Sequence, residues 1–144
     1  MDLTIPVKDS ILNIRVAILA KTINGYLLEK NPGGFLYFIG GRIKINETSE
    51  EAAKRELMEE TGIKTDKISF KTVIENFFID SEKKFVHEIC FVYMVDKELE
   101  IDSKKLKLVE CSITDFKNTD IKPVAIRDFI LNNDNRPHIV NKDY

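Results

Sequence analysis

The chain has little of the chemistry that sulfur and imidazole side chains supply. Its 144 residues include no tryptophan, two cysteines and two histidines. A zinc site or a thiol nucleophile needs such groups close together, so the composition favours neither. Cys90 and Cys111 lie in apolar, strand-like segments, where we expect both to be small buried core residues. His138 follows Pro137 and is expected in a solvated loop.

Long apolar runs and a strong charge imbalance are lacking as well. No apolar run approaches the roughly 20 residues that a membrane-spanning helix needs. The first residues, MDLT, lack the basic and apolar regions of a signal peptide. The net charge of −2 predicts no basic stripe for a nucleic acid polymer. We therefore expect a cytoplasmic protein that acts neither at a membrane nor on a polymer of nucleic acid.

The remaining composition is that of an ordinary globular protein, with 43% hydrophobic and 32% charged residues. This length suits one domain with a sizeable core. No internal repeat, low-complexity stretch or interdomain linker is visible. We therefore expect a single domain over residues 1–144. The oligomeric state is left open, and a homodimer is one alternative.

Segments with strand character dominate the chain. Asn24-Gly25 is a strong hairpin turn signal, and the polar stretch 80–84 predicts a second turn. Pro123 is expected to open a helix over Val124–Leu131. The expected strands are Ile14–Ala20, Tyr26–Leu28, Phe35–Phe38, Ile68–Ile79, Phe85–Val95 and Lys105–Ser112. Together with one further helix, described next, this pattern predicts an α/β fold with a mixed sheet and helices on opposite faces.

Three carboxylates are concentrated in the other expected helix, which lies between Thr48 and Gly62. At about 100° per residue, Glu56, Glu59 and Glu60 fall within a sector of roughly 100°. The small residues Ala52 and Ala53 lie in or beside that sector, so the carboxylates adjoin the apolar stripe instead of opposing it. Mg²⁺ is a hard cation that takes oxygen ligands and completes its shell with substrate phosphates. The pattern therefore indicates an enclosed anionic site suited to phosphate chemistry.

The flanks of this helix carry clear boundary signals. Thr48 and Glu51 fit a capping box, and Gly62 stands where a left-handed residue ends a helix. Upstream, Gly33-Gly34 and Gly40-Gly41 are expected to mark loops on either side of the apolar segment between them. A glycine pair before the helix would let the backbone approach a ligand closely.

The whole segment from Gly41 to Ile63 resembles the Nudix box, G-x5-E-x7-R-E-U-x-E-E-x-G-U, in which U is aliphatic. Three undefined positions depart from the family's usual residues. Ile39 replaces a common proline, Lys44 a glutamate and Asn46 a glycine, and these changes bear on loop conformation and substrate preference. Every defined position matches: Gly41, Glu47, Arg55, Glu56, Leu57, Glu59, Glu60, Gly62 and Ile63.

The resemblance implies an α/β/α sandwich with the mixed sheet between two helices, and a loop–helix–loop that binds Mg²⁺ or Mn²⁺. It implies that Arg55 and Glu47 pair with each other and orient the carboxylates. The metal ligands implied by the resemblance are Glu56, Glu59 and Glu60, with the carbonyl oxygen of Gly40.

The activity implied by the resemblance is hydrolysis of a nucleoside diphosphate linked to another group, by attack of water on phosphorus. One helix carboxylate would act as general base. A modified nucleoside triphosphate, ADP-ribose and a nucleotide sugar all remain open as the small-molecule substrate. The alternative function is a nucleotide-sensing, non-catalytic regulatory domain. Such domains usually lose box carboxylates, whereas this box is intact, and no helix-turn-helix segment is present.

Residues outside the box supply further candidates for the site. Glu88 interrupts an apolar strand and is the first candidate for an additional carboxylate, with Glu75 and Glu110 next; the alternative for each is a salt-bridged or sheet-edge residue. Arg42 follows the glycine pair and is a candidate phosphate contact, or else a solvated loop arginine. Phe38 is a candidate for stacking on a nucleobase, against the alternative of a core residue. Other aromatic candidates are Phe35, Tyr37, Phe77 and Phe78.

Overall fold

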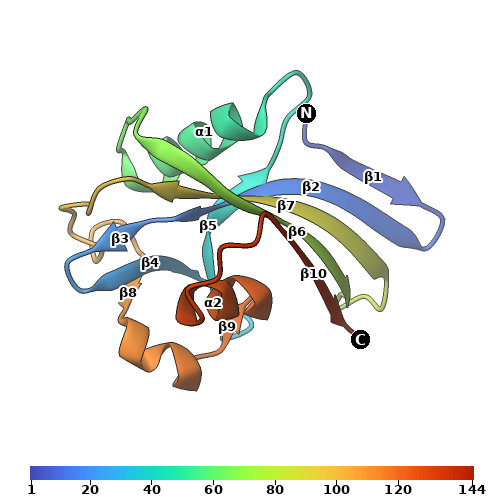
Figure 1. Cartoon of the computed structure of the whole chain (residues 1–144). Helices are drawn as coiled ribbons and strands as arrows, with labels where there is room; N and C mark the ends of the chain where they lie inside the picture. The colour runs from blue at the N-terminus through green and yellow to red at the C-terminus, as the bar shows by residue number, and fades with distance from the viewer.

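The computed structural model describes all residues from 1 to 144 and contains one mixed sheet of ten strands between two helices (Figure 1). The helices are α1 (Ser49–Thr61) and α2 (Val124–Leu131), and a short 3-10 helix covers Ile113–Asn118. The strands are β1 (Thr4–Val7), β2 (Ser10–Leu19), β3 (Lys21–Thr22), β4 (Gly25–Lys30), β5 (Leu36–Arg42), β6 (Ile68–Ile79), β7 (Phe85–Val95), β8 (Val109–Cys111), β9 (Ile121–Lys122) and β10 (His138–Asp143).

The strand order is β10-β6-β7-β2-β5-β4-β3, with β1, β8 and β9 pairing at the sides of β2, β4 and β5. The long strands β6 and β7 form an antiparallel hairpin, and β2 lies parallel to β7 and antiparallel to β5. Strand β10 runs parallel to β6 and closes that edge of the sheet, as Figure 1 shows. The central position of β2 therefore joins the box-bearing half of the sheet to the β6–β7 half.

A separate apolar core covers each face of the sheet. Ala52, Ala53 and Leu57 of α1 pack on one face, and Ile126 and Phe129 of α2 pack on the other. Figure 1 shows α1 and α2 on opposite sides, so the predicted α/β/α arrangement is confirmed. Neither helix has the length and apolar character required to cross a membrane.

Several local predictions are confirmed to the residue. Strands β6 and β7 and helix α2 have the expected bounds. In α1, Thr48 and Glu51 form a capping box with both reciprocal bonds, and Gly62 adopts a φ of 75° at the end of the helix. The two cysteines are free and buried, as expected.

Three expectations are wrong. Gly40-Gly41 does not belong to a loop, because β5 continues through both glycines to Arg42. The expected strand over residues 105–112 shrinks to Val109–Cys111, because turns occupy the preceding residues and Lys107 has a positive φ of 60°. His138 is exposed but begins strand β10.

Candidate active site

The close approach made possible by the glycine pair is between β5 and α1. A Cβ atom at Gly41 would overlap the carboxylate of Glu56, and one at Gly40 would overlap the backbone carbonyl of Val16 on β2. Gly41 thus lets the carboxylate of Glu56 lie against the strand, where only 8% of Glu56 is exposed. The carbonyl of Gly40 lies in β5, where this residue pairs with Ala17.

The loop between β5 and α1 is shaped by Glu47. One of its carboxylate oxygens accepts a hydrogen bond from the backbone N–H of Lys44 at 2.9 Å. Asn46 adopts a left-handed φ of 64°, a conformation that asparagine tolerates better than most residues. The replacement of the family's usual glycine at this position therefore leaves the tight turn in place.

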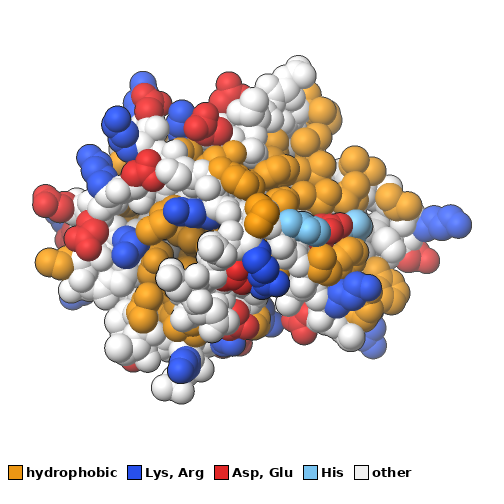
Figure 2. Space-filling model, in the orientation of Figure 1, with side chains coloured by type: hydrophobic (Ala, Val, Ile, Leu, Met, Phe, Trp, Pro, Cys, Tyr) orange, Lys and Arg blue, Asp and Glu red, His pale blue; other side chains and the backbone are white.

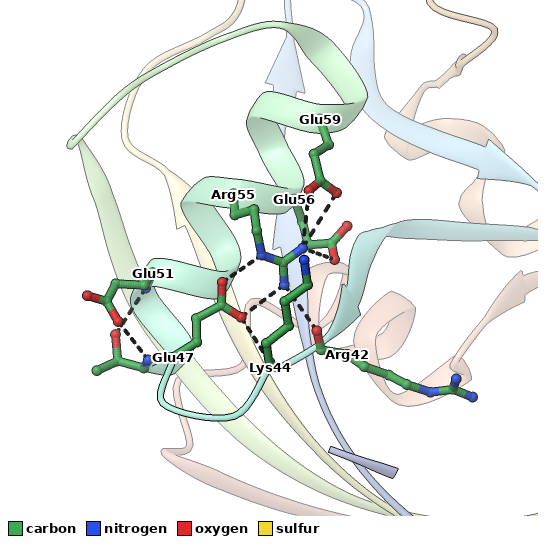
Figure 3. Close-up of polar contacts among 8 residues, drawn as sticks. Arg42, Lys44, Glu47, Glu51, Arg55, Glu56 and Glu59 are labelled. Atoms are coloured by element: carbon green, nitrogen blue, oxygen red, sulfur yellow. Dashed lines mark hydrogen bonds and ion pairs between the residues drawn. The ribbon is translucent and has the colours of Figure 1, made fainter. Parts of the chain in front are cut away.

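Arg55 is the centre of the polar contacts on α1, as Figure 3 shows. Its Nε and Nη2 donate to the two oxygens of Glu47 at 2.6 and 2.9 Å. Its Nη1 donates to Glu56 at 2.8 Å, and more weakly to Glu59 at 3.4 Å. Its Nη2 also donates to the carbonyl of Arg42 at 3.1 Å. The hydrogen bond from Arg55 keeps the pKa of Glu47 below its ordinary value, so one planar guanidinium fixes both loop and helix.

The three box carboxylates differ in their surroundings. Burial raises the pKa of Glu56 even though Arg55 opposes this shift. Glu59 has a side chain that is 53% exposed, and Glu60 is half-buried. As the side chains stand, no three acidic or imidazole groups converge on one point within coordinating distance. Arg55 holds Glu56 and Glu59 instead.

Glu29, on β4, is a carboxylate that sequence reasoning missed. Burial raises its pKa to about 8, and the neighbouring carboxyl of Glu60, to which it is hydrogen bonded, adds to the effect. It lies two residues after the fully buried Leu27 of β4 and so shares the strand face of Leu27, which packs in the α1-side core. That spacing was available from the sequence, and it would have placed Glu29 on the face that bears the box.

The donor chemistry of this site fits a hard divalent cation. Glu29, Glu56 and Glu60 influence one another, because the charges of Glu56 and Glu60 both raise the pKa of Glu29. A cation would remove this mutual repulsion, and carboxylate oxygens are the ligands that Mg²⁺ and Mn²⁺ prefer. Mg²⁺ usually takes only one or two carboxylates and completes its shell with water and phosphate oxygens. The residues present therefore fit the ion that the family resemblance implies.

Arg15, on β2, connects this anionic site to a cavity. Its positive charge opposes the rise that burial causes in the pKa of Glu29 on one side and of Glu88 on the other. Its Nη1 lies 3.9 Å from the carboxylate of Glu88, and its side chain is 29% exposed. Sequence reasoning missed Arg15, although its spacing of two and four residues from Ala17 and Leu19 placed it on their face of β2, the α2 side.

The cavity has a volume of about 440 Å³ and lies between the sheet and the start of α2. Aromatic rings of Phe35, Tyr37 and Phe78 line it, and Arg15 and Glu88 also reach it. Lys122 lies near the same opening, with its ammonium 4.8 Å from the centre of the Phe35 ring. This combination of aromatic walls with a few polar groups is typical of a small-molecule site.

The remaining candidates from the sequence lie as follows. Glu88 is 6% exposed and belongs to the cavity floor, where it faces Arg15. Phe38 is among the residues that line the cavity. It is only 2% exposed and packs edge-on against Phe116, so its burial favours a core role over stacking on a base. The side chain of Arg42 is exposed and points away from the carboxylates in Figure 3.

The other two carboxylate candidates are remote from this cavity face. Glu110 accepts a hydrogen bond from Thr22 at 2.6 Å. Glu75 contacts both histidines of the chain, His138 at 2.7 Å and His87 at 3.9 Å. Figure 2 shows the two histidines beside an acidic side chain in an apolar surface. Strand alternation directs Glu75 to the opposite side of β6 from the cavity.

Comparisons with known proteins agree with this arrangement. A family model for the NUDIX domain matches residues 14–129. The chain is also 32% identical over 74 residues to an 8-oxo-dGTP diphosphatase from Proteus vulgaris, an alignment that covers 48% of this chain and 66% of that protein. The matched region thus spans just under two thirds of that relative's length.

Solved structures share the fold at low sequence identity. A MutT protein from Bacillus halodurans superposes with a TM-score of 0.66 at 19% identity, over 90% of this chain and 86% of that one. A MutT protein from Methanosarcina mazei Go1 superposes with a TM-score of 0.59 at 20% identity, over 91% of this chain and 99% of that one. Because the family model spans most of the sequence and includes the loop and helix built around Arg55, the chain belongs to the Nudix family.

Proposed function

We propose that this protein is a divalent-metal-dependent pyrophosphohydrolase that acts on a nucleoside diphosphate linked to a further group. The observation that carries the proposal is the order of three features along the site. Carboxylates lie at one end, the aromatic cavity lies at the other, and Arg15 lies between them and influences the pKa of groups in both. A nucleotide has the same order, with anionic phosphates at one end and a flat base at the other.

In the proposed reaction, the oxygen of a water molecule forms a bond to phosphorus and the anhydride P–O bond breaks. The electron pair of that bond leaves with the departing phosphate, and a carboxylate of α1 takes the proton of the water. A bound Mg²⁺ or Mn²⁺ would supply charge neutralisation of the phosphate oxygens and a lower pKa for bound water. Glu56, Glu59 and Glu60 are the residues that would hold the ion, with the Gly40 carbonyl and Glu29 beside them.

Two arginines have different parts in this proposal. Arg55 holds Glu47 and Glu56 by hydrogen bonds and so maintains the positions of the carboxylates without touching substrate. Arg15 has a partly exposed side chain between the carboxylates and the cavity, where its guanidinium suits a phosphate oxygen. Arg42 extends into solvent beside the site and is a less favoured phosphate contact.

For the substrate, we propose a purine nucleoside triphosphate, which would be cleaved to the monophosphate and pyrophosphate. The relative described as an 8-oxo-dGTP diphosphatase supports this class. The aromatic lining of the cavity supports a base at that position, since Phe35, Tyr37 and Phe78 offer apolar contact to a flat ring. ADP-ribose and nucleotide sugars are the competing substrates.

The test is a panel of dGTP, 8-oxo-dGTP, dATP, ADP-ribose and a nucleotide sugar, each with Mg²⁺, with Mn²⁺ and with excess chelator. We expect pyrophosphate release from a purine triphosphate, lost with chelator and restored by the metal. Full turnover in excess chelator would contradict metal dependence. Binding of nucleotides without any turnover in the presence of metal would favour the sensing alternative.

A further inference from the structure

A row of polar side chains crosses five strands of the sheet. Residue pairing places Thr4 opposite Asn13, Asn13 beside Glu88, Glu88 opposite Asn76, and Asn76 beside Asn141. Paired residues on neighbouring strands point to the same face of a sheet. The row therefore lies on the α2 side, next to the core residues Ile74, Cys90 and Ile139, which stand two positions away from it along β6, β7 and β10.

The centre of this row is deeply buried. Asn13, Asn76 and Glu88 are only 8%, 6% and 6% exposed. Burial raises the pKa of Glu88, with Arg15 and Asn76 opposing the shift. The side-chain oxygen of Asn13 has no hydrogen-bond partner. Burial of polar groups costs free energy that apolar residues at the same positions would not require, so the row calls for a function other than stability.

Most of the row forms the floor of the 440 Å³ cavity. Asn76, Glu88 and Asn141 all line it. Phe78 and Asp143, which pair with each other two positions further along β6 and β10, line it as well. Asn141 and Asp143 belong to β10, which lies beyond residue 129, where the match to the family model ends. Strand β10 thus gives this cavity a wall that the family match does not include.

The free hydrogen-bonding groups of the floor are mainly acceptors. The Nδ2 of Asn141 donates to the Oδ1 of Asn76 at 2.7 Å, and Asn76 in turn is hydrogen bonded to Glu88. These bonds leave the carbonyl oxygen of Asn141 and lone pairs of the Glu88 carboxylate available as acceptors, and one amide N–H each of Asn141 and Asn76 available as donors. The carboxylate of Asp143 adds a further acceptor at the same cavity. A complementary ligand edge carries adjacent N–H donors.

We propose that Asn141, Asn76 and Glu88 bind the Watson–Crick edge of a guanine ring, and that β10 makes the protein selective for guanine nucleotides. Guanine offers neighbouring N1–H and N2–H₂ donors, whereas adenine offers only its N6 amino group beside an acceptor. The O6 acceptor of guanine would take the remaining N–H of Asn76 or Arg15. The inference rests on the proposed nucleotide hydrolysis, because it names the base of that substrate.

The test uses Asn141→Ala in the full chain, since Asn141 is only half-buried and its loss should leave the fold intact. Val140→Ala is the matched control, because Val140 is the preceding residue of the same strand and is 53% exposed. Two quantities are measured for each protein: kcat/KM for dGTP and dATP with Mg²⁺, and calorimetric binding of GMP and AMP without turnover.

We expect the wild type to prefer dGTP and GMP. In Asn141→Ala, kcat/KM for dGTP should fall about tenfold because KM rises, while kcat for dGTP and kcat/KM for dATP stay nearly unchanged. The reason is that a site built to hydrogen-bond a ligand group loses discrimination when one of its partners is removed. Val140→Ala should match the wild type. Equal values for dGTP and dATP in the wild type, or an unchanged preference in Asn141→Ala, would overturn the inference.

The binding measurement separates this inference from the proposed function. A preference for GMP over AMP that is lost in Asn141→Ala would support recognition of guanine by this row of side chains. If such a protein hydrolysed no triphosphate, the proposed function alone would fail. Hydrolysis of dGTP without any preference for GMP over AMP would support the proposed function and overturn the proposed guanine recognition. Binding of neither monophosphate would overturn the proposed row.

Discussion

Replacement of Arg55 by lysine separates the geometry of this residue from its charge. The guanidinium makes hydrogen bonds in several directions: to both oxygens of Glu47 at 2.6 and 2.9 Å, to Glu56 at 2.8 Å and to the Arg42 carbonyl at 3.1 Å. A lysine ammonium has three N–H groups on one atom and no planar fork. It can keep one carboxylate in place, but it cannot hold Glu47 and Glu56 together in their present positions.

The magnitude follows from the bonds that are lost. Hydrogen bonds to charged groups contribute about 1.5–3 kcal/mol each, and at least two of them have no equivalent in Arg55→Lys. Because the Arg55 side chain is 22% exposed, water and the new ammonium offset part of this loss, and we expect the free energy of unfolding to fall by about 2 kcal/mol. The affinity for Mn²⁺ should weaken about tenfold, as when groups that orient metal ligands are altered.

The assay is a calorimetric titration with Mn²⁺ that measures its binding affinity, and turnover and urea unfolding are measured on the same samples. Arg127→Lys is the matched control, since the Arg127 side chain is 23% exposed and pairs only with the adjacent Asp128 at 3.2 Å. The control should behave as the wild type. If Arg55→Lys gave an unchanged Mn²⁺ midpoint and rate, Arg55 would not orient the ligands, and the account of the site would be refuted.

Three further predictions concern single carboxylates. Glu60→Gln should lower turnover by about 10²–10³, whereas Glu50→Gln on the same helix, where Glu50 pairs with Lys54 at 3.7 Å, should change turnover little; equal losses would refute the assignment of the helix face. Without metal and at a pH above about 8, where the Glu29 carboxyl is ionised beside Glu60, Glu29→Gln should raise the free energy of unfolding because it removes that repulsion. The same variant should weaken Mn²⁺ binding about tenfold; a lower stability, or an unchanged Mn²⁺ affinity, would argue against a cation between the two carboxyls. Burial raises the pKa of Glu88 above 4.5, so the folded state binds more protons than the unfolded state, and stability falls as pH rises through that raised pKa. Urea unfolding at pH about 5 and about 8 should therefore show the wild type losing stability relative to Glu88→Gln, and parallel profiles would contradict a raised pKa.

Local signals predicted the box and its helix well. The capping box of Thr48, the left-handed Gly62 and the spacing of the carboxylates all depend on residues within a few positions of one another, and the structure agrees at each terminus. The same holds for β6 and β7, whose intervening polar turn is visible in the sequence. The error at Gly40-Gly41 has a physical cause. Glycine is permitted in loops, but here it is required because α1 and β2 pack directly against the strand.

The parts of the site that were missed depend on contacts between distant segments. Glu29 and Glu60 are 31 positions apart in the sequence, and only the packing of α1 on β5, the strand that pairs with β4, brings their carboxyls together. In the sequence, Arg15 is a single charge within an apolar run. Only the order of the strands shows that it lies between Glu29 and Glu88.

Strand β10 is the clearest example of this limit. Its sequence, HIVNKD, is short and mostly polar, and it becomes a strand because the edge of β6 supplies hydrogen-bonding partners in parallel register. That register, and not any local preference, brings Asn141 beside Asn76 and so to the cavity floor. A shift by one residue would turn Asn141 to the opposite face. The selectivity proposed for this site is therefore a property of sheet register, and the residues that set the register of β10 are as important to it as Asn141 itself.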